Sequence, residues 1–402
     1  MNPIKRAYCR IYQQVFHVAI PFLPYRHPKD LNNMEELAKL LLKKKKNTVL
    51  LVTDPVIRGA GITTHLEQVL KSQGIQCIVY DRTVANPTTE NVAQALALYQ
   101  ENGCQALIGF GGGSSIDCAK AVGARVAYPK KELADMEGIL KVRRRLPLLI
   151  AIPTTAGTGS ETTLASVITD AETRHKYPIN SFPLIPRYAV LDPEVTRSLP
   201  PHLTAATGMD ALTHAVEAYV GHSTTSGTRK DAVRAVQLIF ENIRRVYENG
   251  NDRKARRRML YASYLAGNAF TRSYVGYVHA VAHSLGGKYN VPHGLANAVL
   301  LPVVLKAYGE TAWKPLHRLA VAVGLAERQE EAQAGAERFI QAVKDMKRDL
   351  QIGDTIPEIQ PEDIPALAKK ADKEANPLYP VPKLMNGKEL EQLYYAVMEE
   401  EK

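Results

Sequence analysis

Four short apolar runs, each separated from the next by a stretch with helical spacing, constrain the first half of this chain most strongly. Apolar runs without polar alternation are typical of strands that are buried on both faces of a sheet. The alternation therefore predicts an α/β fold with a parallel, doubly wound sheet, and its ligands are expected at the carboxyl ends of the strands. The runs lie at residues 47–54, 76–81, 106–110 and 147–153.

After Asp192 and Pro193 the pattern changes, and helical spacing continues to the end of the chain. Helical stretches are expected near residues 226–249, 253–270 and 388–398. A chain of 402 residues is long enough for two domains that each bury a core. We therefore predict an α/β domain over residues 1–192 and an all-helical domain over residues 193–402, with the active cleft between them.

Two glycine-rich loops follow the third and fourth predicted strands. The first brings Gly112, Gly113 and Ser114 directly before a helical stretch, and the second is PTTAGTGSETT at residues 153–163. Glycines let the backbone approach a pyrophosphate closely, and the amides of a helix N-terminus supply hydrogen-bond donors. Ser114 stands where the dinucleotide fingerprint has its third glycine, and tight turns also use glycine for steric reasons alone. Two such loops at one sheet edge nevertheless favour a phosphate-bearing ligand.

Histidines are concentrated in one short segment of the second half. His279 and His283 are four residues apart, so on a helix they project from the same face, and His293 follows in a Pro-His-Gly turn that opens a further helix. Asp210 and His214 repeat the four-residue spacing on another apolar helical stretch. A single buried histidine is more often a hydrogen-bonded core residue than a ligand. Two pairs and a third histidine, however, favour a shared site for a divalent first-row metal.

Charge and cysteine usage narrow the class of partner. The formal net charge is +10, but the basic residues are scattered, apart from runs at 43–46 and 143–145 that have no interleaved aromatic residues. This pattern argues against nucleic-acid binding, although a positive field is suited to attracting an anionic cofactor. The four cysteines form no C-x-x-C pair, and the apolar segment at 15–23 is too short to span a membrane and lacks a signal-peptide cleavage site. We therefore predict a cytoplasmic protein that binds neither nucleic acid nor a membrane.

Four motifs, in matching order and spacing, resemble the iron-dependent (group III) alcohol dehydrogenases. They are GGGSSIDCAK, PTTAGTGSETT, DPEVTRSLPPHLTAATGMDALTHAVEAY and HAVAHSLGGKYNVPHGLANAVLLP, and the resemblance runs from about residue 47 to the C-terminus. It implies a dinucleotide-binding α/β domain followed by an all-helical metal domain, the architecture of dehydroquinate synthase, in a homodimer or higher homo-oligomer. The segment before Lys29 departs from the family pattern, so the family's first hairpin and its dimer contact are not carried over.

The resemblance also implies roles for individual residues. His283 is similar to the family's non-ligand histidine, which is placed beside the substrate for proton transfer, and Phe270 matches a position near the substrate. Asp54 resembles the acid that accepts from the adenosine ribose and favours NAD over NADP, although an Asp-Pro turn also accounts for an aspartate there. The implied metal ligands are Asp210, His214, His279 and His293. The implied cofactor contacts are Asp54, Gly112, Gly113, Ser114, Thr154, Thr155, Thr158 and Lys176.

The activity implied by the resemblance is that of an NAD-dependent alcohol dehydrogenase or aldehyde reductase. A divalent cation polarises the substrate oxygen, while a hydride passes between NAD(H) and a short-chain primary alcohol or aldehyde. The ligand types permit Zn²⁺ or another divalent metal, and the resemblance favours Fe²⁺. Two alternatives are a lyase similar to dehydroquinate synthase and a non-enzymatic metal-binding protein.

Arg272 suggests a substrate with an anionic tail. It lies seven residues before His279, so on one continuous helix the two side chains would share a face. A guanidinium there would pair bidentately with a carboxylate, sulfonate or phosphonate. Gly276 argues against this arrangement because it favours a break in the helix, and Arg272 would then lie at a helix C-terminus.

Overall fold

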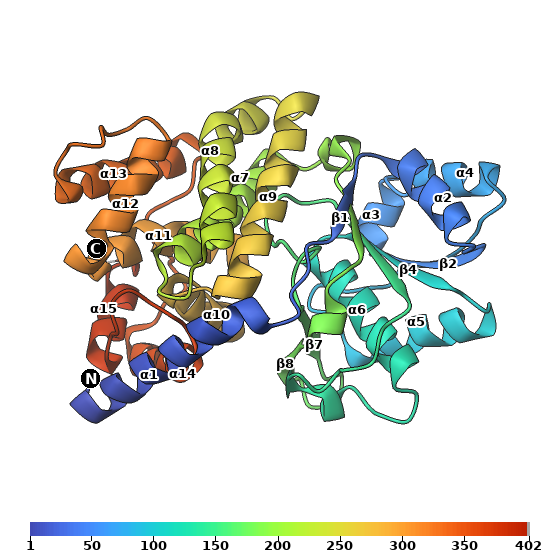
Figure 1. Ribbon diagram of the computed structural model, residues 1–402, viewed down its shortest axis with the longest axis horizontal. Helices are drawn as coiled ribbons and strands as arrows, with labels where there is room; N and C mark the ends of the chain where they lie inside the picture. The colour runs from blue at the N-terminus through green and yellow to red at the C-terminus, as the bar shows by residue number, and fades with distance from the viewer. Residues whose placement is uncertain (400–402) are drawn as a thin grey trace. The chain divides into compact units, whose positions relative to one another are not determined.

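The computed structural model describes residues 1–399, and the chain divides into two compact units (Figure 1). The α/β unit is Pro24–Leu199, and the helical unit joins Met1–Leu23 to the chain from Pro200 onward. The division thus falls a few residues after the sequence-based boundary at 192. The N-terminal segment belongs to the helical unit, whereas the sequence-based division had placed it in the α/β domain.

A six-stranded parallel sheet forms the centre of the α/β unit, in the order β1-β9-β6-β4-β2-β3. Its strands are β1 (Lys29–Leu31), β2 (Thr48–Val52), β3 (Gln76–Tyr80), β4 (Ala106–Gly111), β6 (Leu148–Pro153) and β9 (Tyr188–Val190). The four strands predicted from apolar runs are confirmed as β2, β3, β4 and β6. The two short strands β9 and β1 extend the sheet beyond β6 and were not predicted.

Helices cover both faces of this sheet. Val49 and Leu51 of β2 pack with α2 and α4, whereas Leu50 and Val52 pack with α5 and α6. Consecutive residues of a strand point to opposite faces of the sheet. When both faces are covered by helices, every position is buried, and apolar residues do not alternate with polar ones. This double burial explains the continuous apolar runs of the sequence. The helices of the unit are α2 (Met34–Lys43), α3 (Pro55–Gly59), α4 (Thr64–Ser72), α5 (Thr89–Glu101) and α6 (Gly113–Ala127).

A smaller, three-stranded sheet of the order β5-β8-β7 completes the α/β unit. Strands β7 (Ala165–Thr169) and β8 (Lys176–Asn180) pair antiparallel, and β5 (Gly138–Ile139) adds two residues beside β8. Single 3₁₀ turns lie at η2 (Ala134–Met136), η3 (Phe182–Leu184) and η4 (Pro193–Thr196).

The helical unit is built from antiparallel and crossing helices (Figure 1). Helices α7, α8 and α9 pack against one another, and α11 packs against both α7 and α10. The predicted helical stretches are confirmed as α8, α9 and α15. Its later elements are α7 (Pro201–Val220), α8 (Ser226–Glu248), α9 (Arg253–Ser273), α10 (Tyr277–Tyr289), α11 (His293–Tyr308), α12 (Glu310–Ala322), α13 (Ala332–Asp349), η5 (Pro361–Asp363), α14 (Ile364–Ala375) and α15 (Gly387–Tyr395). Within residues 1–399, no helix combines the length and apolar character needed to cross a membrane.

The N-terminal helix α1 (Pro3–Ala19) is held by the C-terminal part of the helical unit. Gln13 Nε2 donates to the carbonyl of Tyr379 at 2.7 Å, and Arg10 donates to the carbonyl of Val381 at 2.7 Å. These polar contacts join segments at opposite ends of the sequence. They explain why the N-terminal segment lies with the helices although it precedes the α/β unit in the chain.

Candidate metal centre and cofactor loops

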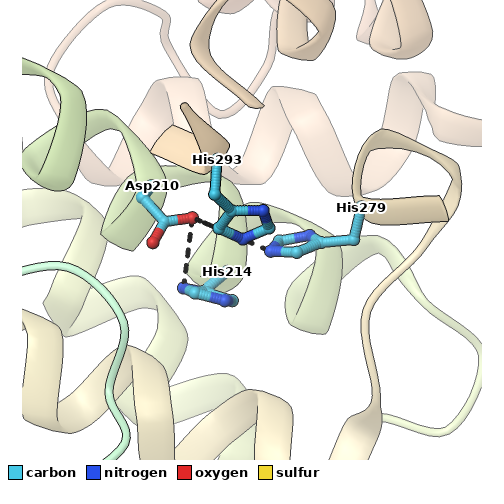
Figure 2. Close-up of side chains that lie close together, drawn as sticks. All are labelled: Asp210, His214, His279 and His293. Carbon is cyan, nitrogen blue, oxygen red and sulfur yellow. Dashed lines mark ion pairs between the residues drawn. The ribbon is translucent and has the colours of Figure 1, made fainter. Parts of the chain in front are cut away.

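Three helices of the helical unit carry the four predicted metal ligands (Figure 2). Asp210 and His214 lie one turn apart on α7, His279 lies on α10, and His293 is the first residue of α11. Because α11 packs against both α7 and α10, residues that are far apart in the sequence meet at one point. Asp210, His214 and His279 are buried there, whereas the side chain of His293 is 40% exposed.

The ligand set is one carboxylate oxygen and three imidazole nitrogens, all within 4.8 Å of one another. Asp210 Oδ1 lies 3.5 Å from His293 Nε2, 3.8 Å from His279 Nε2 and 3.9 Å from His214 Nδ1. Ligand atoms bonded tetrahedrally at about 2.1 Å from a cation lie about 3.4 Å apart. The three separations from Asp210 Oδ1 equal or slightly exceed that value, and the donor types suit a first-row divalent cation such as Fe²⁺ or Zn²⁺. The four residues therefore fit a metal ion.

Glu217 orients His279 through the ring nitrogen that is not a ligand. Its carboxylate lies 2.6 Å from His279 Nδ1 and accepts the backbone N–H of Val278 at 2.8 Å. A proton on Nδ1 leaves Nε2, which lies 3.8 Å from Asp210 Oδ1, with a lone pair that can bind a cation. Burial raises the pKa of Glu217 to about 7, and burial together with the neighbouring imidazoles lowers the pKa of His279 well below its usual range. His279 is therefore neutral near pH 7, as a metal ligand must be.

Asn297, one turn after His293 on α11, lies among the ligand atoms. Its Nδ2 donates to Asp210 Oδ1 at 2.7 Å and lies 3.2 Å from His279 Nε2 and 3.1 Å from His293 Nε2. The residue is fully buried. Because the amide contacts ligands from all three helices, it fixes the direction of the Asp210 carboxylate relative to the imidazoles.

His283 lies on α10 beside the ligand set without belonging to it. Its ring stacks on His293 with centroids 5.2 Å apart, and its Nδ1 lies 2.6 Å from Glu374 Oε1. The hydroxyl of Tyr379 donates to the same carboxylate oxygen at 2.7 Å. Burial opposes the charged form of Glu374, but the charge of His283 and the two hydrogen bonds hold the pKa of Glu374 below its usual value. The side chain of His283 is 43% exposed, so it reaches from the ligand set to the surface.

Phe270, near the end of α9, lies beside one of the ligands. Its ring stacks on that of His214, with centroids 4.0 Å apart and an interplanar angle of 12°. The ring therefore forms an apolar wall against the ligand set.

The continuous helix on which the seven-residue spacing argument for Arg272 depended is absent, and a contact of Arg272 with the substrate stays a prediction. Helix α9 ends at Ser273, and Tyr274, with φ 61° and ψ 179°, turns the chain before α10 begins at Tyr277. Gly276 lies in this turn. Arg272 is partly buried in the last turn of α9, which is the alternative placement considered from the sequence.

The two glycine-rich loops lie side by side in the α/β unit, at the ends of β4 and β6. The backbone N–H of Thr154 donates to the carbonyl of Gly111 at 3.0 Å, and a Cβ placed on Gly113 would lie 3.4 Å from Thr158. Thr155 is partly buried in the second loop. The predicted juxtaposition of the two loops at one sheet edge is therefore present.

Gly112 and its neighbours leave the start of α6 accessible to a ligand. Gly112 is the N-cap of α6 and supplies no side chain over the first turn. Ser114 Oγ accepts the backbone N–H of Asn86 at 3.3 Å, and Lys176 Nζ donates to Asn86 Oδ1 at 2.6 Å. Asn86 thus links two predicted cofactor residues from different segments. The open helix N-terminus and a nearby ammonium are suited to binding phosphate groups.

Asp54 caps a helix. Its Oδ1 accepts the backbone N–H groups of Val56 and Ile57 at 3.0 and 2.9 Å, and its Oδ2 accepts from Ser115 Oγ at 3.2 Å. The carboxylate adjoins the first glycine loop, because a Cβ on Gly111 would lie 3.1 Å from Oδ2. Asp54 therefore has the structural role in an Asp-Pro turn that the sequence analysis gave as the alternative. A contact between Asp54 and the adenosine ribose stays a prediction.

A buried polar cluster, which the sequence did not reveal, ties α6 to the second loop. Lys120 Nζ donates to Ser160 Oγ at 3.0 Å and to Thr163 Oγ1 at 2.9 Å, and Ser160 Oγ donates to Asp117 Oδ1 at 2.6 Å. Glu161 follows in the same loop, where burial raises its pKa to about 7. The SSIDCAK and GTGSETT motifs are thus partly structural, because they hold the two loops together.

Sequence reasoning missed three residues that support the candidate metal centre. Glu217 lies seven residues after Asp210, and Asn297 lies four after His293, so helical spacing alone was sufficient to find both. Glu374 is 91 positions from its partner His283 and no local pattern links them.

Two family models match the chain. The model of the iron-containing alcohol dehydrogenase covers residues 29–193, and that of the Fe-containing alcohol dehydrogenase family, C-terminal, covers residues 204–398. Alcohol dehydrogenase 4 of Saccharomyces cerevisiae (strain YJM789) is 39% identical over 85% of this chain and 89% of its own length. The 1,3-propanediol dehydrogenase of Citrobacter freundii is 36% identical over 95% and 98%, and the NAD-dependent methanol dehydrogenase of Bacillus methanolicus is 34% identical over 84% and 89%.

Solved structures show the same architecture. A 1,3-propanediol oxidoreductase superposes with a TM-score of 0.88 at 34% identity, over 92% of this chain and 97% of that one. A sulfoacetaldehyde reductase from Bifidobacterium kashiwanohense in complex with NAD⁺ superposes with a TM-score of 0.83 at 26% identity, over 93% and 98%. Family models match both halves of the chain, a parallel sheet is followed by a helical unit, and the ligand set fits a metal ion. The chain therefore belongs to the iron-containing alcohol dehydrogenase family, whose members are oxidoreductases that use NAD and iron.

Proposed function

We propose that this NAD-dependent alcohol dehydrogenase interconverts short-chain primary alcohols and their aldehydes at a divalent metal held by Asp210, His214, His279 and His293. The observation that carries the proposal is the convergence of these four ligand atoms within 4.8 Å. Its substrate class is supported by relatives named for methanol and 1,3-propanediol, which are short primary alcohols. When bound, the cation supplies Lewis acidity toward the substrate oxygen, and NAD carries the hydride.

His283 takes up or returns the hydroxyl proton in this proposal. Support comes from its position on α10 beside the ligand set and from its 2.6 Å contact with Glu374. The carboxylate stabilises the protonated imidazole, and the exposed part of the ring passes the proton to water. Phe270 forms the apolar wall against which the carbon chain of the substrate packs.

The α/β unit binds NAD in this proposal. The pyrophosphate lies at the N-terminus of α6, against Gly112, Gly113 and Ser114, because the open amides there favour negative charge. The second loop contributes further cofactor contacts through Thr154, Thr155 and Thr158. Lys176, at the start of β8, contributes another. Asp54, which adjoins the first loop at Gly111 and Ser115, accepts from the adenosine ribose and repels a 2′-phosphate.

An anionic tail on the aldehyde is a second candidate for substrate. It is favoured by the similarity to a protein named as a sulfoacetaldehyde reductase, and Arg272 lies five positions before α10, the helix that carries His279. The helix break after Ser273 weighs against Arg272 as the recognising group. We therefore place neutral short-chain substrates first. We further propose that the protein is a homo-oligomer and that it works in the cytoplasm. Its four free cysteines agree with a reducing compartment.

The test is a panel of aldehydes of equal length, neutral or with a carboxylate or sulfonate tail, reduced by the iron-loaded protein with NADH. Net oxidation of NADH with neutral aldehydes supports the proposal, and a reaction without net change in NADH would favour the lyase alternative. If the anionic compounds have the higher kcat/KM, and Arg272→Ala raises KM only for them, the second candidate is correct.

A further inference from the structure

One face of α1 carries large apolar side chains that the protein does not bury. Six of them, on α1 and on the short turn η1 (Ile20–Phe22) that follows it, are between 57% and 85% exposed. Together they expose on the order of 800 Å², more than a monomer usually leaves in one contiguous patch. The six residues are Ile4, Tyr8, Ile11, Val15, Val18 and Phe22. We call this set the apolar stripe.

The opposite face of α1 is already occupied. Cys9 and Gln13 are buried there, Arg10 donates to the carbonyl of Pro382 at 2.8 Å, and Lys5 pairs with Asp372 at 2.7 Å. The helix is therefore anchored on its own chain by one side. The apolar stripe points away from that anchor, so the fold of this chain does not explain it.

The spacing within the stripe indicates what covers it. Successive residues are four, three, four, three and four positions apart, which is the a and d repeat of a helix that packs along another helix. A helix that lies on a membrane surface has instead a wide apolar face flanked by free lysine and arginine side chains. Here Arg10 is turned into the protein, and Lys5 is paired with Asp372. Arg6 is exposed, but it lies seven residues before Gln13 and so on the side of α1 away from the stripe.

The stripe is also symmetric about Gln13. Ile11 and Val15 lie two positions to either side of it, Tyr8 and Val18 lie five, and Ile4 and Phe22 lie nine. Two identical helices that run antiparallel would therefore place each Ile11 against the partner's Val15, and so on outward. The exposed area of the stripe is comparable with the roughly 800 Å² that one partner contributes to a standard interface.

We propose that the apolar stripe is an interface with the α1 helix of a second copy of this chain, packed antiparallel about a two-fold axis that crosses the stripe between Ile11 and Val15. The proposal supplies a surface for the homo-oligomer proposed above and does not depend on the reaction. Such an interface is self-complementary, as closed dimers require.

The test is sedimentation equilibrium of the full-length protein. Ile11→Glu introduces two carboxylates into the paired helices and should raise the dissociation constant at least tenfold, roughly the effect of 1.4 kcal/mol. Arg6→Gln makes the chain more negative by the same one unit, but Arg6 is exposed on the side of α1 away from the stripe, so association should be unchanged. In the double variant Ile11→Glu with Val15→Lys, opposite charges face each other across an antiparallel pair, so association should recover.

Circular dichroism and NADH-dependent activity of Ile11→Glu report whether the chain still folds. A wild-type protein that is a single chain in solution would overturn the proposal, as would association unaffected by Ile11→Glu. Failure of the double variant to recover would overturn the antiparallel pairing. Vesicles of phosphatidylcholine and phosphatidylglycerol form the last arm, because cosedimentation of the wild-type protein, lost in Ile11→Glu, would assign the stripe to a membrane instead.

Discussion

At the scale of single residues, the geometry of the ligand set depends on groups that are not ligands. Glu217 holds one ring nitrogen of His279 and caps α10 through the N–H of Val278, while Asn297 holds the carboxylate of Asp210. Partners of this kind fix ring orientation and tautomer, and their loss typically weakens metal binding by about 10–100-fold.

Glu217→Gln is therefore expected to weaken metal affinity about tenfold, near the lower end of that range, because the amide still accepts one hydrogen bond. Competitive titration of the metal-free protein with a chelator of known affinity measures this directly. Glu241→Gln, on the exposed side of α8, removes the same charge and should have no effect. Equal affinity in Glu217→Gln and the wild-type protein would show that the carboxylate does not position His279.

Glu161 makes the stability of the protein depend on pH, and the direction of that dependence follows from its raised pKa. Burial raises that pKa from 4.5 to about 7, and among residues 1–399 neither carboxylate oxygen has a hydrogen-bond partner. Between these values the folded state holds a proton that the unfolded state releases, so this group lowers the stability of the protein as pH rises from about 4.5 to 7.

Glu161→Gln removes that titration. Its free energy of unfolding relative to the wild-type protein should rise with pH across this window, by a few kcal/mol at most, since one pKa unit corresponds to about 1.4 kcal/mol. Urea unfolding without added NAD, at about pH 5 and pH 8, checks the result. A difference that is constant with pH would contradict the raised pKa.

At the scale of elements, the turn between α9 and α10 sets the position of the ligand helix. Tyr274 adopts a positive φ that costs a non-glycine residue of order 1–3 kcal/mol. Gly276 follows, and a Cβ there would lie 2.6 Å from Glu217 Oε1 and 3.1 Å from the hydroxyl of Tyr308. The break in the helix is what allows the Glu217 carboxylate to reach the first turn of α10.

Gly276→Ala should therefore displace Glu217, lower the melting temperature and weaken metal binding together. Gly287→Ala, in the last turns of the same helix, meets no atom within 4 Å and should be neutral or stabilise by about 0.5–1 kcal/mol. Calorimetry and metal titration of both variants decide the matter. A Gly276→Ala protein that matches the wild type in both measurements would remove the steric argument.

The same elements show what a sequence can and cannot predict. The central strands were predictable because burial on both faces leaves a continuous apolar run, as in β2 and β4. Strand β8 was not, since its exposed and buried residues alternate and Pro178 interrupts its pattern. Asp210 and His214, like His279 and His283, were found from a four-residue spacing within a single helix, which is a local signal. The exclusion of His283 from the ligand set came from the family resemblance and not from spacing. The contact of His283 with Glu374 depends on how α10 and α14 pack, which no local pattern shows. The spacing of Arg272 and His279 could not be used because α9 ends between them, as Gly276 had suggested.

At the scale of the whole molecule, the chain divides its chemistry between two compact units. The helical unit contains the ligand set and His283, and the α/β unit contains the two glycine-rich loops. The proposed reaction draws on residues of both units, whereas the proposed metal site uses only residues of the helical unit. Metal content and NADH oxidation are thus separable measurements of the same protein.

The central claim is that Asp210, His214, His279 and His293 hold the metal, while His283 acts only on the proton. The most direct test is elemental analysis of iron-loaded, desalted protein in three forms, paired with NADH-dependent aldehyde reduction. The wild-type protein and His283→Ala should each retain one metal ion per chain, with the rate of His283→Ala reduced by about 10²–10⁴-fold. His279→Ala should lose both metal and activity. A metal-free His283→Ala together with a fully loaded His279→Ala would contradict the assignment.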